Sequence, residues 1–463
     1  MAEAESDIQL PPQPQASIFQ RVYHSIGLHT FLSSPKDIKI LFFQRFVRLF
    51  AYGQSTLILT LYFGRLGIDD AHKGLFMSLT LFGDMLISFC LTLVADSLGR
   101  RKILALGAVM MAGAGATFAL ASNFWILLAA AIIGVISPSG NEIGPFRAIE
   151  ESTLAQLTPA EVRSDIFGWY ALTGAFAAAL GNLSCGWIVH VLHTVYEWDL
   201  LRAYRMIYLL YTGFALLKLL LTAILSAECE AKVVKPRAEA LPAHEQTPLL
   251  DGQQPPTAAP RRSFFPHISP ESRSILLQLS LIMGLDSAAS GVANSSWITY
   301  YFAKTFSVDQ STLGIIFFTT NLVTALSSLA AVSISKRIGL VKTMVFTHLP
   351  SAIFLALVPV FPGLAPALTF LILRSSLAQM DVAPRSAFIA AVVLPSERTA
   401  VMGWVNVVKT CAQGIGPTIT GWLASTNHFG VFFILAGCMK ATYDLLILVV
   451  FSRVRTDREG RRL

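Results

Sequence analysis

Residues 141–151 read Asn-Glu-Ile-Gly-Pro-Phe-Arg-Ala-Ile-Glu-Glu, which places five polar or charged side chains after the apolar run 124–135. Ionisable side chains at membrane depth are costly and persist where they pair or face water, so they indicate a functional site. A second copy lies downstream, where residues 381–385 read Asp-Val-Ala-Pro-Arg. This copy repeats the acid, the proline three residues later and the nearby arginine. The repeat predicts a chain built of two related halves.

Further matches extend the repeat over the helix that follows in each half. From Arg163 and Arg398 onward, the matching residues stay 235 positions apart. The first half contributes Pro159, Glu161, Arg163, Gly168, Trp169, Gly181, Gly186 and Trp187, and the second half contributes Pro395, Glu397, Arg398, Gly403, Trp404, Gly416, Gly421 and Trp422. Internal repeats are typical of secondary transporters, whose substrate sites lie between the repeats near the bilayer midplane.

The composition indicates an integral membrane protein. Of 463 residues, 54% are hydrophobic and only 14% are charged, whereas charged residues make up about a quarter of soluble domains. The net charge of +7 comes from basic residues spread between apolar spans, which argues against nucleic-acid binding. The five cysteines have no CxxC spacing, so neither a disulfide framework nor a metal site is indicated. No nucleotide-binding, HExxH or GxSxG motif occurs, so we expect neither an enzyme nor a cofactor.

Twelve segments are long and apolar enough to cross a bilayer, which takes roughly 20 residues. We therefore expect an all-α integral membrane protein with 12 transmembrane helices in two homologous six-helix bundles. The expected spans are 38–63, 75–97, 103–121, 124–152, 164–192 and 203–226, then 274–302, 310–334, 342–360, 364–392, 397–424 and 429–451.

The domain organisation follows from these spans. The sequence predicts a flexible cytosolic N-terminal tail over 1–37, a first bundle over 38–227, a cytosolic linker over 228–273, a second bundle over 274–452 and a basic cytosolic tail over 453–463. The linker is rich in proline, alanine, glutamine and charge, and it buries too little apolar surface to fold alone. Lysine and arginine gather on the side of both termini, which predicts that this side faces the cytosol.

The loop between the expected second and third helices, Ala95–Lys102, resembles the cytoplasmic signature loop of the major facilitator superfamily. That pattern has a glycine, three residues, an aspartate, a basic residue, any residue, a glycine and two basic residues. The matching residues are Asp96, Gly99, Arg100 and Arg101. Thr92 replaces the first glycine, Ser97 replaces the first basic residue, and the second half has a weaker copy at Lys336–Lys342. Together with the spans and the repeat, the resemblance covers the whole chain and implies the major facilitator fold.

A gate at the cytosolic end is expected from this loop. Gly99 permits the backbone conformation of a tight turn, and Asp96 is expected to approach Arg398 at the start of the eleventh helix. A carboxylate at a helix N-terminus is favoured by about 0.3–1 kcal/mol, so breaking this contact would open the gate. The alternative is that the basic residues only set topology. The predicted gate residues are Asp96, Gly99, Arg100, Arg101, Gly339 and Arg398.

The resemblance implies that the first, fourth, seventh and tenth helices line a central cavity, and each carries charge at depth. The predicted substrate and proton pathway consists of Arg45, Arg48, Glu142, Arg147, Asp286, Trp297, Tyr300, Arg374, Asp381 and Arg385. Aligning Gly53 with Gly291 places Arg48 and Asp286 at equal depth. We therefore expect these two side chains to face each other across the cavity, where they could pair.

The same alignment makes Glu142 and Asp381 equivalent, and two facing acids raise each other's proton affinity. That arrangement suits a proton carrier. The alternative is that Arg147 and Arg385 reach the inner surface and neutralise nearby acids structurally, namely Glu142, Glu150, Glu151 and Asp381. Glu150 and Glu151 are interpreted as structural charges, because charge is less costly near the membrane surface. Trp297 and Tyr300 are equally consistent with a substrate pocket and with interfacial anchoring.

Three functions stay open at this point. The first is a secondary active transporter that moves a small-molecule substrate by alternating access with proton coupling, the substrate being an organic anion or an amphiphilic drug. The second is a passive facilitator of the same fold. The third is a transporter-like receptor, against which the short tails argue. We expect a monomer in the lipid bilayer, with protons and the substrate as its partners.

The linker contains an acidic dileucine pattern, Glu245-Gln246-Thr247-Pro248-Leu249-Leu250. Sorting adaptors read such segments in extended chains, with Glu245, Leu249 and Leu250 as the recognised residues. This interpretation predicts an endosomal or vacuolar membrane. Chance occurrence is the alternative, since a short pattern has weak specificity, and it leaves the plasma membrane open.

Overall fold

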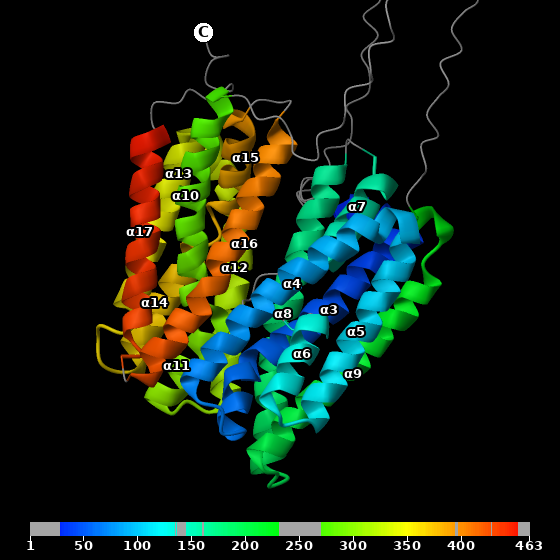
Figure 1. The fold of residues 1–463 in the computed structure, drawn as a ribbon, viewed down its shortest axis with the longest axis vertical. Helices are drawn as coiled ribbons and strands as arrows, with labels where there is room; N and C mark the ends of the chain where they lie inside the picture. The colour runs from blue at the N-terminus through cyan, green and yellow to red at the C-terminus, as the bar shows by residue number, and fades with distance from the viewer. Residues whose placement is uncertain are drawn as a thin grey trace, which may run out of the picture.

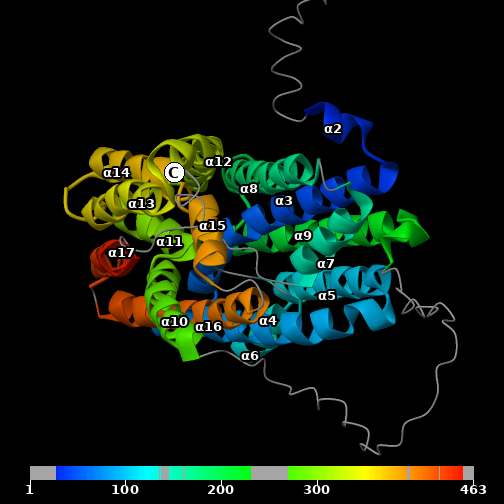
Figure 2. The ribbon, with the colours of Figure 1, turned by 90° about the horizontal axis from the view of Figure 1, so that it is seen from above.

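The computed structural model describes residues 28–134, 136, 145–159, 162–230, 270–393, 397–426 and 428–451. Over these ranges the regular elements are helices, and they form two bundles that stand side by side (Figure 1, Figure 2). The predicted all-α class with two bundles is confirmed.

The first bundle contains α2 (Leu28–Ser33), α3 (Lys36–Arg65), α4 (Asp70–Leu98), α5 (Arg100–Leu120), α6 (Phe124–Gly134), α7 (Pro145–Leu157), α8 (Arg163–Thr194), α9 (Leu200–Ile224) and the short η1 (Ala227–Cys229). The second bundle contains α10 (Pro270–Val292), α11 (Ser295–Phe306), α12 (Gln310–Ile338), α13 (Leu340–Leu357), α14 (Leu364–Leu377), α15 (Val382–Val392), α16 (Arg398–Ser425) and α17 (Val431–Phe451).

Eight segments of the described chain are long and apolar enough to cross a membrane. They are Asp70–Leu91, Arg100–Leu120, Asp165–Thr194, Leu200–Ile224, Arg273–Phe306, Gln310–Ser328, Leu340–Leu357 and Val431–Phe451. The more polar α3 and α16 add two helices of 30 and 28 residues. The set is consistent with the twelve predicted spans.

Three predicted spans are each divided into two helices, at the fourth, seventh and tenth positions. Residues next to each break account for its position. Pro145 is the first residue of α7, where its missing N–H costs nothing, and Pro384 lies in the first turn of α15. At the break in the seventh span, the Asn294 side chain accepts a hydrogen bond from the Trp297 backbone N–H (2.9 Å) and caps α11. The break in the tenth span thus occurs at one copy of the duplicated polar stretch, and the other copy contains the start of α7.

The two ends of the molecule differ in how the bundles meet. We call the end with Gly99, Gly339 and η1 the linker end, and the opposite end, with the turns before α4 and α12, the far end. In Figure 1 the linker end is at the top and the far end at the bottom. The bundles touch mainly through α8 with α12, α4 with α16, and α3 with α11.

Glycines bring these helices together near the far end. A Cβ atom on Gly186 of α8 would lie 2.3 Å from the carbonyl oxygen of Gln310, and one on Gly74 of α4 would lie 2.5 Å from that of Pro417. Small residues permit such close backbone approach. The repeat also contains Gly168 and Gly403, but no atom within 4 Å would meet a Cβ there.

Two short helices lie where the sequence predicts tail and linker. Helix α2 falls within the predicted tail, and its Phe31 ring lies 4.6 Å from that of Phe42 on α3. Helix η1 lies at the start of the predicted linker, where Cys229 is buried. Both segments therefore pack against the first bundle.

We expect Gly186→Ala to weaken the closed far end, because the new methyl group overlaps the α12 backbone. Overpacking costs typically about 1–3 kcal/mol. Thermal unfolding of the purified protein in detergent measures the effect. Gly168→Ala on the same helix is the control, and it should leave stability unchanged or raise it slightly, because a helical alanine is favoured over glycine. Equal melting temperatures for both variants would contradict the close contact.

Candidate functional site

A buried charge cluster lies inside the first bundle, and we call it the N-half cluster: Arg48, Glu150, Tyr170 and Lys218. Arg48 Nη2 lies 2.7 Å from Glu150 Oε2, and Lys218 Nζ lies 2.8 Å from Glu150 Oε1. The Tyr170 hydroxyl donates to the same carboxylate. Glu150 and Lys218 have no exposed surface, so both carboxylate oxygens are satisfied by charged or hydroxyl donors without water.

Four different helices assemble the N-half cluster. Arg48 comes from α3, Glu150 from α7, Tyr170 from α8 and Lys218 from α9. The Phe146 ring covers the cations, with Lys218 Nζ 4.6 Å and the Arg48 guanidinium carbon 5.2 Å from its centroid. The ion pairs therefore lie in an apolar setting, where breaking them is costly.

A second cluster lies inside the other bundle, and we call it the C-half cluster: Asp286, His348, Asp381, Arg385, Lys440 and Asp444. Asp286 on α10 is its centre. Lys440 Nζ lies 2.7 Å from Asp286 Oδ1, and Arg385 Nη1 lies 2.8 Å from Asp286 Oδ2. Arg385 also donates to Asp381 through Nη2. One guanidinium thus joins two buried carboxylates.

The break in the tenth span places Asp381 in this cluster. Asp381 occupies the N-cap position of α15 but makes no capping hydrogen bond through its side chain. Its side chain instead reaches Arg385, one turn later on the same helix. The duplicated Asp-Val-Ala-Pro-Arg stretch is thereby a self-contained ion pair at a helix break.

His348 extends the C-half cluster away from Asp286. Its Nδ1 lies 2.9 Å from Asp444 Oδ2, and its Nε2 lies 3.6 Å from Asp286 Oδ1. The ring comes from α13, and Asp444 comes from α17. Asp286, His348 and Asp444 are each at most 4% exposed.

The direct pair between Arg48 and Asp286, which the repeat alignment made possible, is not formed. Both side chains are buried, at 7% and 4% exposure, but each pairs within its own bundle. A buried charge is stabilised by the nearest geometrically suitable partner, and Glu150 and Arg385 supply it. Sequence alignment of the halves carries no information on which helix inside one bundle provides that partner.

The interpretation of Glu150 as a structural charge agrees with its ion pairs, and the side chain lies inside the bundle and not at its surface. Glu150 is fully buried and central to the N-half cluster. Its neighbour Glu151 fits the expectation, since it pairs with Arg147 across one turn (2.7 Å), with 31% and 51% of the two side chains exposed. Arg147 therefore lies outside the N-half cluster.

The remaining pathway residues are distributed over the two bundles. Arg45 is buried, with its guanidinium carbon 3.9 Å from the centre of the Tyr170 ring. Arg374 lies in the last turn of α14, and its carbonyl accepts a hydrogen bond from Ser351 (3.1 Å). Trp297 is fully buried against Phe429 and Tyr300, which favours a packing role.

Tyr300 belongs to a polar lock between the bundles at the far end. Lys304 Nζ lies 2.9 Å from Asp70 Oδ2, and Lys73 Nζ donates to the Tyr300 hydroxyl at 3.1 Å. We call these four residues the far-end lock. Beside them, the His72 backbone N–H donates to Asp69 and holds the pKa of that carboxyl below its ordinary value.

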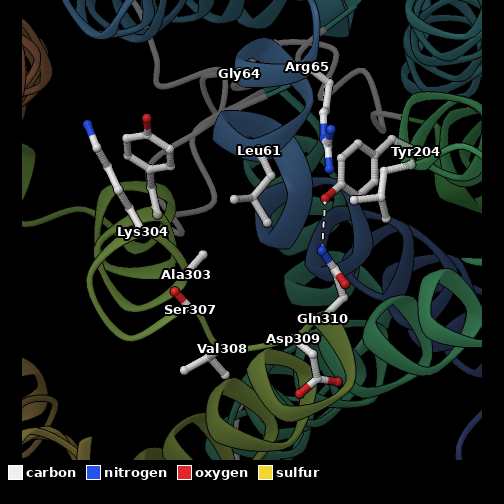
Figure 3. A pocket seen from close by; sticks show the side chains of 12 residues that line it. Leu61, Gly64, Arg65, Tyr204, Ala303, Lys304, Ser307, Val308, Asp309 and Gln310 are labelled. Carbon is white, nitrogen blue, oxygen red and sulfur yellow. Dashed lines mark hydrogen bonds between the residues drawn. The ribbon is translucent and has the colours of Figure 1, made fainter. Parts of the chain in front are cut away.

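A pocket of about 580 Å³ opens next to the far-end lock (Figure 3). Arg65 and Leu61 of α3 border one side, and Ala303 and Lys304 of α11 border the other. The Gln310 side chain donates to the Tyr204 hydroxyl (3.2 Å) and joins the bundles at its edge. The pocket therefore lies between the halves at the end where they meet.

The signature loop has the expected backbone but an additional partner. Gly99 has φ = 101° and Gly339 has φ = 87°, so both turns need a residue without a Cβ. The Arg100 backbone N–H donates to Glu230 Oε2 (2.6 Å), and its side chain donates to Gln156 (3.1 Å). Arg101 is half-buried beside it. The loop is thus tied to the chain that follows α9.

Several predicted residues lie outside what the structure describes. These are Glu142, the linker residues Glu245, Leu249 and Leu250, and the side chains of Asp96 and Arg398. The expected contact between Asp96 and Arg398 stays a prediction.

Five members of the clusters were missed as site residues in the sequence: Tyr170, Lys218, His348, Lys440 and Asp444. The last four are ionisable residues within apolar spans, which is itself the signal of a functional residue in a membrane. Among the described residues, no group of three potential metal ligands comes together to hold an ion.

The chain matches a known protein family along most of its length. The model of the Major Facilitator Superfamily matches residues 41–283 and, a second time, residues 279–462. An uncharacterized membrane protein of Saccharomyces cerevisiae is 36% identical over 434 residues, which cover 92% of this chain and 96% of the yeast protein.

Two further proteins are more distant. The quinolone resistance protein NorA of Staphylococcus aureus is 25% identical over 158 residues, covering 34% of this chain and 39% of NorA. The solved structure of the nucleoside transporter NupG superposes with a TM-score of 0.69 at 14% identity, covering 89% of this chain and 99% of NupG. At that identity the likeness concerns the fold alone.

We expect Glu150→Gln to destabilise the protein by about 3–5 kcal/mol, because it removes the carboxylate that Arg48 and Lys218 share inside the bundle. Chemical or thermal unfolding followed by circular dichroism measures this loss. Glu151→Gln is the matched control one residue away, and its half-exposed pair should cost less than about 1 kcal/mol. Similar losses for the two variants would show that the N-half cluster does not hold the helices together.

Proposed function

The chain belongs to the major facilitator superfamily, and from this membership we propose a secondary active transporter with proton coupling at the C-half cluster. Membership makes it a multi-pass membrane transporter of small molecules. Coupling is supported by the two ion pairs of Arg385, which binds both Asp286 and Asp381 at the break in the tenth span. Ionisable residues in such positions of transporters serve substrate and proton pathways.

The coupling step follows from competition for Arg385. With both acids ionised, the guanidinium is held between α10 and the start of α15. A proton on Asp381 removes that acid's charge and weakens its bond to Arg385. Arg385 then presents a free N–H face, which matches an anionic group on a solute. Proton binding and solute binding therefore favour each other.

The proposed substrate is an amphiphilic organic molecule with an anionic group. The buried arginines Arg45 and Arg48 and the partly exposed Arg385 favour a carboxylate or phosphate. The partial likeness to a quinolone resistance protein supports an amphiphilic solute, since a quinolone combines an apolar ring system with a carboxylate.

The orientation is part of the same proposal. Basic residues near Gly99 and Gly339 favour the cytosol at the linker end. The structure then represents the state closed to the outside, because the far-end lock and the close glycine contacts join the bundles there. Glu245, Leu249 and Leu250 favour delivery to an endosomal or vacuolar membrane, where a proton gradient is available.

A passive facilitator with the same fold is the second candidate. Its halves would move in the same way, but solute flux would carry no protons. External acidification coupled to solute movement in proteoliposomes separates the two.

We expect Asp381→Asn to leave the protein folded but to abolish the response of solute flux to a pH gradient. A gradient of about one pH unit, worth 1.4 kcal/mol per proton, drives about tenfold accumulation in the parent protein. Uptake of a quinolone and of a simple organic anion into proteoliposomes is the measurement, with Glu142→Gln tested in parallel. The control is Asp165→Asn, an exposed acid on α8. Unchanged pH dependence in both test variants would reject coupling at these acids.

We expect Lys304→Gln to favour opening of the far end, because it breaks the ion pair with Asp70 across the bundles. A partly exposed pair contributes at most about 1 kcal/mol, so the equilibrium should shift by up to about fivefold. Spin labels at the exposed Tyr196 and Val360 report the distance between the bundles there. Arg202→Gln removes a far-end cation whose described contact, with Trp198, stays within one bundle, and it should have no effect. A parent-like distance distribution in Lys304→Gln would exclude the far-end lock as a gate.

A further inference from the structure

His348 on α13 and Asp444 on α17 form a buried pair that does not include the acid at the helix break, Asp381. We infer that this pair holds one exchangeable proton and that His348 passes it to Asp286. The inference deepens the proposed function and rests on it for its role in transport. Its structural basis is the position of one imidazole between two buried carboxylates.

The ring geometry favours the protonated imidazole. Nδ1 faces Asp444 at 2.9 Å, and Nε2 faces Asp286 at 3.6 Å. A neutral imidazole that donates to Asp444 would turn the lone pair of Nε2 toward Asp286, whereas the imidazolium donates to Asp444 and turns a positively charged N–H toward Asp286 at ion-pair distance. The ring is 3% exposed, so water does not substitute for the missing donor.

The local charges lead to the same conclusion. Within ion-pair distance the C-half cluster contains three carboxylates, Asp286, Asp381 and Asp444, but only two permanent cations, Arg385 and Lys440. Asp444 is fully buried, and its second oxygen has no partner among the described residues. Leaving that carboxylate ionised beside a neutral ring is costly. One proton on the pair balances the cluster.

The other neighbours of His348 do not supply this charge. On α17, the Tyr443 ring stacks edge-on at 5.5 Å. On α14, Arg374 contacts α13 through its carbonyl. Lys409 on α16 lies in electrostatic range of Asp286 and Asp381 but forms no ion pair with the described residues. The middle of α12, residues 311–335, contains no titratable side chain.

The transfer step is balanced in atoms and charge. The Nε2–H bond of the imidazolium breaks and an O–H bond forms on Asp286 Oδ1, so the ring and Asp286 both become neutral. Arg385 and Lys440 then lose the carboxylate that they share. Arg385 and Lys440, with 12% and 10% of their side chains exposed, both still reach solvent. Protonation inside the bundle is thereby linked to release of the same guanidinium that the solute is proposed to bind.

Infrared difference spectroscopy of the purified full-length chain, between mildly alkaline and mildly acidic medium, tests the site with the proton itself as the probe. We expect an imidazole band that His348→Gln removes and a shift of the Asp444 carboxylate band that Asp444→Asn removes. Because losing the ring leaves Asp444 neutral, the Asp444 band should also stop changing with pH in His348→Gln. The controls are His428→Gln and Asp165→Asn, which alter exposed side chains.

The double variant His348→Gln/Asp444→Asn is expected to fold, because two amides can hydrogen-bond to each other without leaving a buried charge. It therefore tests the proton site even where a single variant misfolds. Its melting temperature should match that of the parent, and in proteoliposomes it should lose accumulation driven by a pH gradient. Spectra of both single variants that match the parent would overturn the proton site. Absence of solute flux in the parent would instead reject the proposed function, and the infrared result would still decide the proton site.

Discussion

The carboxylate of Asp286 is a buried acid on which the arrangement of three helices of the second bundle depends. It binds Lys440 from α17 and Arg385 from α15, so three helices depend on one buried acid. Glu150 does the same in the first bundle for α3, α8 and α9. Breaking a buried pair from one side costs about 3–5 kcal/mol. Each bundle is therefore held together as a unit by charges that lie inside it.

This division has a mechanical consequence. Because strong ion pairs close within each bundle, the bundles can move relative to each other without exposing an uncompensated charge. The polar contacts between them are weaker and lie near the far end. They are partly exposed pairs such as Lys304 with Asp70, worth about 1 kcal/mol or less, and they lie beside glycine-mediated helix packing. A transporter that alternates between two states needs this order of strengths.

The fold was largely predictable from the sequence, and the pairing of charges was not. Apolar spans and the duplicated Asp-Val-Ala-Pro-Arg stretch identify two bundles, because span length and repeats are properties of the chain itself. The position of the break in the tenth span is also local, since Pro384 and Asp381 lie in the quoted stretch. By contrast, Glu150 pairs with Lys218, which is 68 residues away. Such a pair depends on how each helix is rotated about its axis in the bundle. A shift of one or two residues turns a side chain to another face of the helix and changes its partner.

The two clusters also show how a duplicated bundle can diverge. The first helix of each half contributes a buried charge, but the sign is inverted, with Arg48 in one half and Asp286 in the other. The helix that restarts after the break carries the matching opposite charge, Glu150 in α7 and Arg385 in α15. Changing one sign alone would leave a buried charge unpaired, so both partners must differ together. The inversion gives the second half an acidic centre with two further carboxylates around it. Proton chemistry is therefore expected in that half, while the first half offers cations.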